Sequence, residues 1–98
     1  DIRNSKVVDI INELKDFGVD VDVVDAYADP EEVKQMYGFS LIEKPRNNYD
    51  AVIVAVSHDA YKDLDEKYFK SLTCDNAVLV DVKGMYGGKI NELKYWSL

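Results

Sequence analysis

The sequence is short of the residues on which metal sites and disulfides depend. Its 98 residues include one cysteine, one histidine and two prolines. A single cysteine excludes an internal disulfide, and together with a single histidine it cannot form a usual structural zinc site. The acidic residues lack the spacing of a calcium-binding loop, so we expect no metal. The lone Cys74 fits a reducing cytoplasm. We expect it to be structural or incidental rather than a nucleophile, because it falls in a turn before a strand and no histidine is near it in sequence.

Basic charge and long apolar runs are also scarce. Lys and Arg number 12 against 19 Asp and Glu, which gives a formal net charge of -7. Nucleic-acid backbones and anionic membranes attract clustered Lys and Arg, so we expect neither as a partner. No apolar run approaches the roughly 20 residues that span a bilayer, and we expect no signal peptide. The remaining composition, 47% hydrophobic and 32% charged, is typical of one folded domain covering residues 1–98.

Hydrophobic periodicity predicts helices in three places. Apolar residues recur at helical spacing over 5–17, up to Gly18. A second helix is expected over 30–37, since it begins with Asp29-Pro30 and is followed by a glycine, and its inward side should carry Val33, Met36 and Tyr37. A third helical region is expected over 59–72, with a break near 63–65.

Three segments are expected to be strands. Residues 19–24 alternate valine with aspartate, which predicts a strand near a sheet edge with one wet face. The run AVIVAVS at 51–57 does not alternate and predicts a central parallel strand covered on both faces. Residues 77–82 form a second apolar strand after a turn at 74–76, and the tail at 90–98 should pack on the domain.

This order of elements predicts an α/β fold, a three-layer Rossmann-like parallel sheet with helices on both faces. Such a fold normally opens with a strand, whereas this chain opens with a helix. Either the sheet has three main strands, or its natural first strand lies upstream of Asp1. In the second case the flanking strands could pair directly, leave a gap, or borrow a strand from another chain.

Three residues are candidates for ligand contact, because ligands of open α/β sheets bind beyond the carboxyl ends of strands and at helix N-termini. Arg3, before the first helix, could hold a phosphate or be an ordinary surface arginine. His58, after the first apolar strand, could face a ligand or be structural. Lys83, after the second, could contact an anion or be solvated in a glycine turn. The glycines of 84–88 match neither a GxGxxG fingerprint nor a Walker loop.

The words DIRNSKVVDIINEL, YDAVIVAVSHDAY, LVDVKGMYGG and KYWSL, in this order and spacing, resemble the C-terminal domain of the UDP-glucose/GDP-mannose dehydrogenase family over essentially the whole chain. The resemblance implies a three-domain, NAD-dependent enzyme that oxidises the C6 alcohol of a nucleotide sugar to a carboxylate in two hydride transfers. NAD lies mainly on an N-terminal Rossmann domain, and a central helical region carries the catalytic cysteine and dimer contacts. The parent is therefore expected to be a homo-oligomer, and this fragment alone inactive and without a catalytic residue, Cys74 included.

The resemblance also implies roles for single residues. Arg3 matches the arginine of the family's D-x-R segment, which contacts NAD across the domain interface. The family's phenylalanine-lysine pair, which contacts the nucleotide sugar, precedes that segment and would lie upstream of this chain. Lys83 falls where many UDP-glucose enzymes have the substrate-contacting arginine of a D-G-R segment, and it keeps the cation without the bidentate fork.

The substrate subclass is implied by the residues around His58. Ser57-His58-Asp59 looks like the A-H-D version found in dehydrogenases of N-acetylated UDP-hexosamines, and the KYWSL ending points the same way. His58 is thereby a marker of subclass and a candidate interface residue. The expected substrate is UDP-N-acetylglucosamine or an epimer, supplying uronic acids for bacterial surface polysaccharide.

A second class of function remains open, a stand-alone flavodoxin-like signalling or nucleotide-binding module. Asp25, Ser57 and Lys83 mimic parts of the residue set of a receiver domain. However, no strand end offers a phosphoacceptor aspartate with two preceding acids, and one strand-helix pair is absent. Stable phosphorylation by a small phosphodonor would favour this class over the dehydrogenase.

Overall fold

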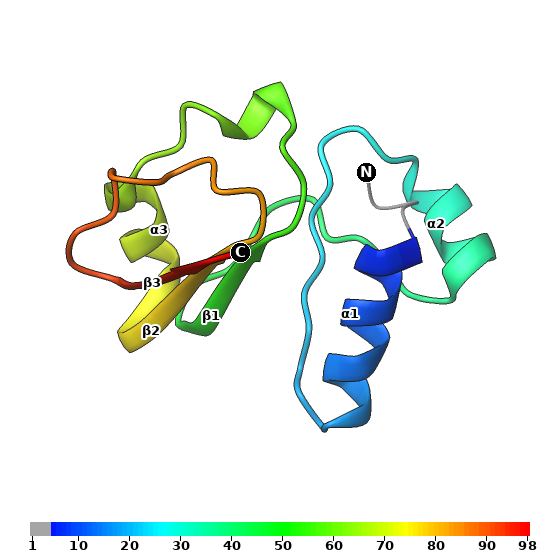
Figure 1. Cartoon of the computed structure of the whole chain (residues 1–98). Helices are drawn as coiled ribbons and strands as arrows, with labels where there is room; N and C mark the ends of the chain where they lie inside the picture. The colour runs from blue at the N-terminus through cyan, green and yellow to red at the C-terminus, as the bar shows by residue number, and fades with distance from the viewer. Residues whose placement is uncertain (1–4) are drawn as a thin grey trace. The chain divides into compact units, whose positions relative to one another are not determined.

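The chain forms an α/β structure in two compact units. The computed structural model describes residues 5–98, and the units are Asp1–Pro45 and Arg46–Leu98. The second unit contains a three-stranded parallel sheet in the order β1-β2-β3 (Figure 1), with strands at Tyr49–Val54, Thr73–Asp81 and Lys94–Ser97. The predicted α/β class and its parallel sheet are confirmed. Within residues 5–98, none of the helices combines the length and apolar character that crossing a bilayer requires.

The first unit contains the two expected helices, α1 (Ser5–Asp16) and α2 (Pro30–Tyr37). The Asp29 carboxylate caps α2 by accepting the Glu31 N–H at 3.0 Å, and Gly38 ends it at φ +81°. Proline at the first helical position and a left-handed glycine after the last one explain these bounds. Val33 is 1% exposed as predicted, but the inward position expected for Met36 is wrong, since that side chain is 57% exposed.

The prediction of a strand over residues 19–24 is wrong. No strand is assigned there in the described part of the first unit, although the N–H of Ile42 donates to the Val23 carbonyl at 2.9 Å. The predicted alternation of faces is nevertheless present, because Val21 and Val23 pack on the cluster of Ile11, Val33 and Phe39. Burial of alternate side chains selects an extended backbone, but a strand also requires a neighbouring strand to pair its N–H and C=O groups.

The prediction that residues 51–57 form the central strand is also wrong. β1 covers 49–54 rather than 51–57, and within the second unit it pairs only with β2, so β2 is the central strand. Ile53 is 38% exposed, which contradicts the expectation of two covered faces. An unbroken run of small and β-branched residues indicated strand correctly, but it did not establish the position of that strand in the sheet.

The segment between β1 and β2 divides as the sequence predicted. A 3-10 turn, η1 (Asp59–Tyr61), precedes α3 (Glu66–Leu72), and the Asp65 carboxylate caps α3 by accepting the Tyr68 N–H at 2.9 Å. The turn expected at 74–76 does not reverse the chain. β2 begins directly at Thr73, and these residues instead produce a shift in its register with β1, with Asn76 at φ +65°.

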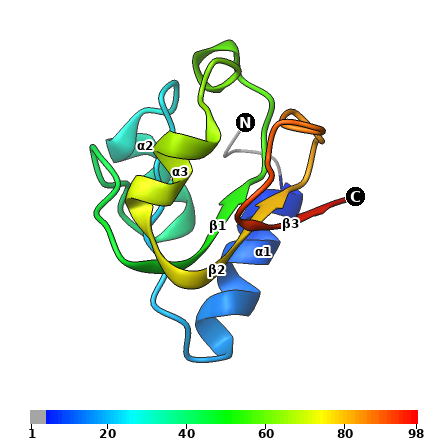
Figure 2. The same cartoon turned by 90° about the vertical axis from the view of Figure 1, so that its left-hand side faces the viewer.

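The core of the second unit lies between α3 and the sheet (Figure 2). Phe69 of α3 and Tyr86 meet edge-on with ring centroids 5.1 Å apart, and Leu79 of β2 completes a cluster of side chains that are at most 2% exposed. Ala77 and Asp81 are also buried, since alternate residues of β2 face the same side of the sheet. An aspartate thus occupies the last inward position of the central strand.

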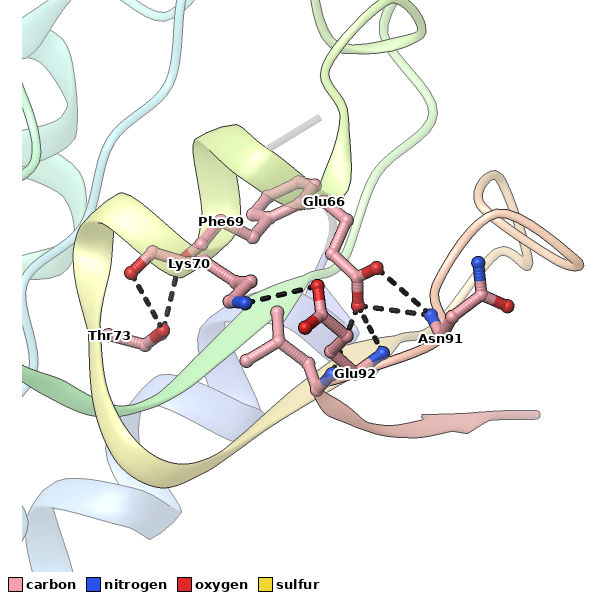
Figure 3. A network of polar contacts seen from close by, with 7 residues as sticks. Glu66, Phe69, Lys70, Thr73, Asn91 and Glu92 are labelled. Atoms are coloured by element: carbon pink, nitrogen blue, oxygen red, sulfur yellow. Dashed lines mark hydrogen bonds and ion pairs between the residues drawn. The ribbon is translucent and has the colours of Figure 1, made fainter.

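A carboxylate on α3 fixes the segment that leads into β3 (Figure 3). Glu66 accepts the N–H groups of Asn91 at 3.0 and 3.1 Å, Glu92 at 2.7 Å and Leu93 at 3.0 Å, and Lys70 forms an ion pair with Glu92 at 3.0 Å. The Leu93 and Glu92 amides lower the pKa of Glu66 because they stabilise its charged form. The expected packing of the tail is confirmed, and four of its residues form a strand.

Candidate functional site at the carboxyl end of the sheet

The carboxyl ends of β1 and β2 bring the segments of His58 and Lys83 to the same end of the sheet. The two strands run parallel with Val54 opposite Asp81, and the N–H of Val82 extends the pairing by donating to the Val54 carbonyl at 3.0 Å. In Figure 1 the segment with η1 and the segment after β2 lie at that same end. This end of an open parallel sheet is where ligands bind.

Lys83 lies in a tight turn that follows β2 immediately. The N–H of Gly84 donates to the Asp81 carbonyl at 3.2 Å, and Gly84 adopts φ +70°, where a side chain is strained. The Lys83 side chain is exposed. The chain continues in turns, with the Gly87 N–H donating to the Gly84 carbonyl at 3.4 Å, and no helix follows within the described residues. The glycines therefore differ from a dinucleotide-binding loop, which opens a helix.

A buried carboxylate holds this turn from the inside. Asp81 is 0% exposed, and its Oδ1 accepts the Met85 N–H at 3.0 Å. Its Oδ2 accepts the Tyr86 N–H at 2.8 Å and the Tyr95 hydroxyl at 2.6 Å. Burial of a charge is costly unless it is hydrogen-bonded, and charge-assisted bonds are the stronger ones. The three donors come from the loop and from β3, so Asp81 ties both to the end of β2.

Two tyrosines around this carboxylate have shifted acidities. Donation to Asp81 raises the pKa of Tyr95, since the bond favours the neutral phenol. Burial, followed by the nearby negative charge of Asp81, raises the pKa of Tyr86 to about 12. Both hydroxyls therefore stay protonated at neutral pH and act as donors. They hold the loop, and they are not groups that accept a proton from a substrate.

His58 is half-buried and contributes to the same assembly through Tyr61. Its carbonyl accepts the Tyr61 N–H at 3.0 Å, and the two rings lie 5.7 Å apart at 42°. The Tyr61 carbonyl in turn accepts the Tyr86 hydroxyl at 2.5 Å. His58 is thus connected to the Lys83 turn indirectly, through the backbone of η1 and Tyr86. The His58 ring therefore lies beside Tyr61 at the carboxyl end of the sheet.

The remaining candidate residues lie away from this site or outside the described chain. Arg3 is outside the described residues. Cys74 lies at the opposite, amino end of β2, where its thiol donates to Asp50 at 3.3 Å. That bond raises the pKa of Cys74 and keeps the thiol neutral, which agrees with the structural role expected for it. Across residues 5–98 no three metal-ligating side chains gather in one place.

Sequence reasoning assigned no role to Asp81 or Tyr95 in this site. The signal was present for Asp81, because a carboxylate stands between Val80 and Val82 at the end of an apolar strand. A buried charge at such a position requires several donors nearby. Tyr95 carried no comparable signal, since its approach to Asp81 depends on the pairing of β2 with β3, where it lies opposite Leu79.

Comparison with known proteins identifies the type of domain. Residues 1–88 match the family described as "UDP-glucose/GDP-mannose dehydrogenase family, UDP binding domain". The chain is 36% identical over 84 residues to the "UDP-N-acetyl-D-glucosamine 6-dehydrogenase" of Salmonella typhi and, with the same figures, to that of Pseudomonas aeruginosa. It is 40% identical over 86 residues to "Protein CapL" of Staphylococcus aureus.

These alignments cover 85 to 87% of this chain and 20% of each relative, so the chain spans about a fifth of the length of the curated relatives it matches. No solved structure matches it significantly. The family match covers most of the chain, which confirms the resemblance drawn from the sequence motifs and leaves the signalling module without support. The chain belongs to the UDP-glucose/GDP-mannose dehydrogenase family and corresponds to its UDP binding domain.

Proposed function

We propose that this chain is the C-terminal substrate-binding domain of an NAD-dependent dehydrogenase that oxidises the C6 alcohol of a UDP-sugar to the uronate. The observation that carries the proposal is the match of residues 1–88 to a UDP binding domain. UDP-N-acetylglucosamine or an epimer is the proposed sugar, since two relatives at 36% identity are named for that substrate. We also propose that the complete parent protein carries the catalytic and NAD-binding domains, forms a homo-oligomer and is cytoplasmic.

Lys83 is the proposed contact to the UDP-sugar in this chain. It is exposed at the carboxyl end of the central strand, and the turn around it is fixed by Asp81 and Gly84. A lysine ammonium binds a phosphate as a point charge, whereas an arginine would bind it with two parallel bonds. With a net charge of -7, a local cation of this kind favours the binding of a diphosphate.

The proposed reaction divides its tasks between this chain and the rest of the parent. The C6 alcohol gives up four electrons to two molecules of NAD, while water supplies the second carboxylate oxygen. Following the resemblance of the motifs to the family, we assign NAD mainly to another domain of the parent, with Arg3 as a contact from this one. His58 helps to shape the carboxyl end of the sheet and marks the substrate subclass.

The substitution Lys83→Ala in the complete parent protein tests the proposed contact. Loss of a charged hydrogen bond should weaken UDP binding by about tenfold or more. Lys89→Ala is the matched control, since Lys89 is an exposed lysine of the same loop, and it should leave the affinity for UDP unchanged. UDP affinity is measured by calorimetric titration. Equal affinities in Lys83→Ala and Lys89→Ala would remove Lys83 from the site.

The reaction itself is tested by following NADH formation with UDP-N-acetylglucosamine and with UDP-glucose. The parent should reduce NAD with the first sugar and much less with the second, and this chain alone should reduce none. A preference for UDP-glucose would refute the proposed substrate subclass but would agree with the family assignment. NAD reduction by the isolated chain would refute the assignment of chemistry to other domains.

A further inference from the structure

The buried Asp81 carboxylate occupies the last core-facing position of β2. A fully buried charge at this place costs stability, and an apolar residue would suit the core formed by Phe69 and Leu79 better. The carboxylate instead engages both oxygens with three donors. Two of the donors, the N–H groups of Met85 and Tyr86, come from the loop that directly follows Lys83. The carboxylate therefore fixes the loop at a cost to the core.

Lys83 lies between Asp81 and three N–H groups that donate to Asp81. The Gly84 N–H donates to the Asp81 carbonyl at 3.2 Å, and the next two N–H groups, of Met85 and Tyr86, donate to the Asp81 carboxylate at 3.0 and 2.8 Å. The backbone that carries the lysine is thus closed into a ring of hydrogen bonds. The long lysine side chain can still rotate about its own bonds, but its point of attachment is held.

Tyr95 adds a connection from β3 to the same carboxylate. Its hydroxyl shares Oδ2 with the Tyr86 N–H, at 2.6 Å, while its backbone lies opposite Leu79 in the sheet. The segment before β3 is itself held by Glu66 of α3, through the amides of residues 91–93. Through Tyr95, the edge strand and the helix both limit how far the Asp81 carboxylate can turn.

We propose that Asp81 and Tyr95 are positioning residues of the UDP-sugar site, which hold the 82–86 turn so that Lys83 meets the ligand in a fixed place. This inference rests on the proposed function of Lys83. When a cationic side chain must become ordered on binding, the conformational entropy that it loses makes the free energy of binding less favourable. A rigid turn avoids part of that loss, since only the side chain remains to be ordered.

The test is a double-mutant cycle in the complete parent protein, with calorimetric UDP affinity as the measured quantity. Tyr95→Phe removes one donor to Asp81 and leaves both backbone donors, so the fold should persist. We expect the dissociation constant for UDP to rise by about threefold to tenfold, which is less than a full charge-assisted bond is worth because the loss reaches the ligand only through the turn. The affinity for NADH, measured on the same samples, should not change.

The control is Tyr68→Phe, which removes a hydroxyl from a half-buried tyrosine that packs on the same core cluster. It should leave UDP affinity unchanged, and thermal unfolding compares the stability of the two phenylalanine variants. Asp81→Asn provides a second probe, since an amide group offers only one oxygen to donors that occupy two positions. It should weaken UDP binding at least as much as Tyr95→Phe.

The decisive comparison is Tyr95→Phe in the presence and absence of Lys83. If Tyr95 acts by positioning Lys83, its substitution should have no further effect on UDP affinity once Lys83 is alanine. Additive effects in the double variant would overturn the inference, as would an unchanged UDP affinity in Tyr95→Phe and Asp81→Asn when Lys83→Ala still weakens binding. An unchanged affinity in Lys83→Ala itself would refute the proposed function instead, so the two failures are distinguishable.

Discussion

Replacement of Tyr86 by phenylalanine should change stability in opposite directions at neutral and at alkaline pH. The Tyr86 side chain is 0% exposed, and its hydroxyl donates to the Tyr61 carbonyl at 2.5 Å. Phenylalanine keeps the ring that packs edge-on against Phe69 and removes only the hydroxyl. Since the net contribution of such a bond is about 1 kcal/mol, Tyr86→Phe should lower the free energy of unfolding by about 1 kcal/mol at neutral pH.

The effect should reverse because the folded state disfavours ionisation of Tyr86. Burial first, and the charge of Asp81 second, raise its pKa from 10.0 to about 12. When the folded pKa of a group is raised, the stability it contributes is present below the unfolded pKa and is lost as the pH rises toward the folded one. Tyr86 should therefore reduce stability from pH 10.0 to about 12, by about 1.4 kcal/mol for each pH unit.

These two quantities fix where the chain and its variant become equally stable. One pH unit above the unfolded pKa removes about as much free energy as the hydroxyl contributes at neutral pH, so the curves should cross near about pH 11. Above the crossing the phenylalanine variant should be the more stable one. Comparing the two proteins at each pH cancels the titration of the other tyrosines and of the lysines, which is common to both.

Urea unfolding followed by circular dichroism, at neutral pH and at about pH 11.5, measures the difference directly. Tyr68→Phe is the control, since it removes a hydroxyl from a half-buried tyrosine beside the same cluster, and it should give no crossing. The reasoning is refuted if Tyr86→Phe is destabilised by the same amount at both pH values, because the tyrosine would then ionise equally well in the folded chain.

Two further substitutions test the loop and the link between α3 and β3. Glu66→Gln should flatten the acid dependence of stability: backbone amides lower the pKa of Glu66 from 4.5, so its contribution is present above that value and is lost as the pH falls toward the folded pKa. Urea unfolding from pH 7 downward should show this against Glu32→Gln on α2, and parallel curves for the two variants would contradict it. Gly84→Ala should lower the free energy of unfolding by about 1 to 2 kcal/mol. The cost comes from backbone strain at φ +70° alone, because the added methyl group would meet no other atom within 4 Å. Gly87→Ala should lower the free energy of unfolding much less, because its added carbon would meet only the Gly84 carbonyl oxygen at 3.6 Å. Equal losses in the two variants would show that backbone strain at Gly84 is not the cause.

Local signals in the sequence predicted the helices better than the sheet. Asp29, Pro30 and Gly38 define α2 through interactions within a few residues, and the structure has the helix at these bounds. The place of a strand within a sheet depends on partners far away in the chain. The apolar run at 51–57 resembled a central strand, yet β1 pairs with β2 alone in the second unit. Residues 19–24 have the pattern of a strand without a strand assigned beside them in the described part of the first unit.

For the candidate site, too, local signals were predictive and distant partners were not. The sequence placed Lys83 and His58 at strand ends, because the ends of apolar runs can be read locally, and the structure has both segments at one end of the sheet. The residues that hold the Lys83 turn could not be found in this way. Tyr95 lies 14 residues after Asp81 and reaches it only because β3 pairs with β2 in register.

The burial of Asp81 also bears on how an acidic chain can bind an acidic ligand. This carboxylate stands close to Lys83 in the chain, with only Val82 between them, and an exposed aspartate there would attract the ammonium group and repel a diphosphate. In the folded chain both oxygens of Asp81 face inward onto the Met85 and Tyr86 amides and the Tyr95 hydroxyl. The negative charge is thereby satisfied inside the protein, while the lysine that follows is exposed. The same hydrogen bonds that fix the turn thus keep the Asp81 charge buried and occupied by donors, so we expect substitution at Tyr95 to weaken UDP binding.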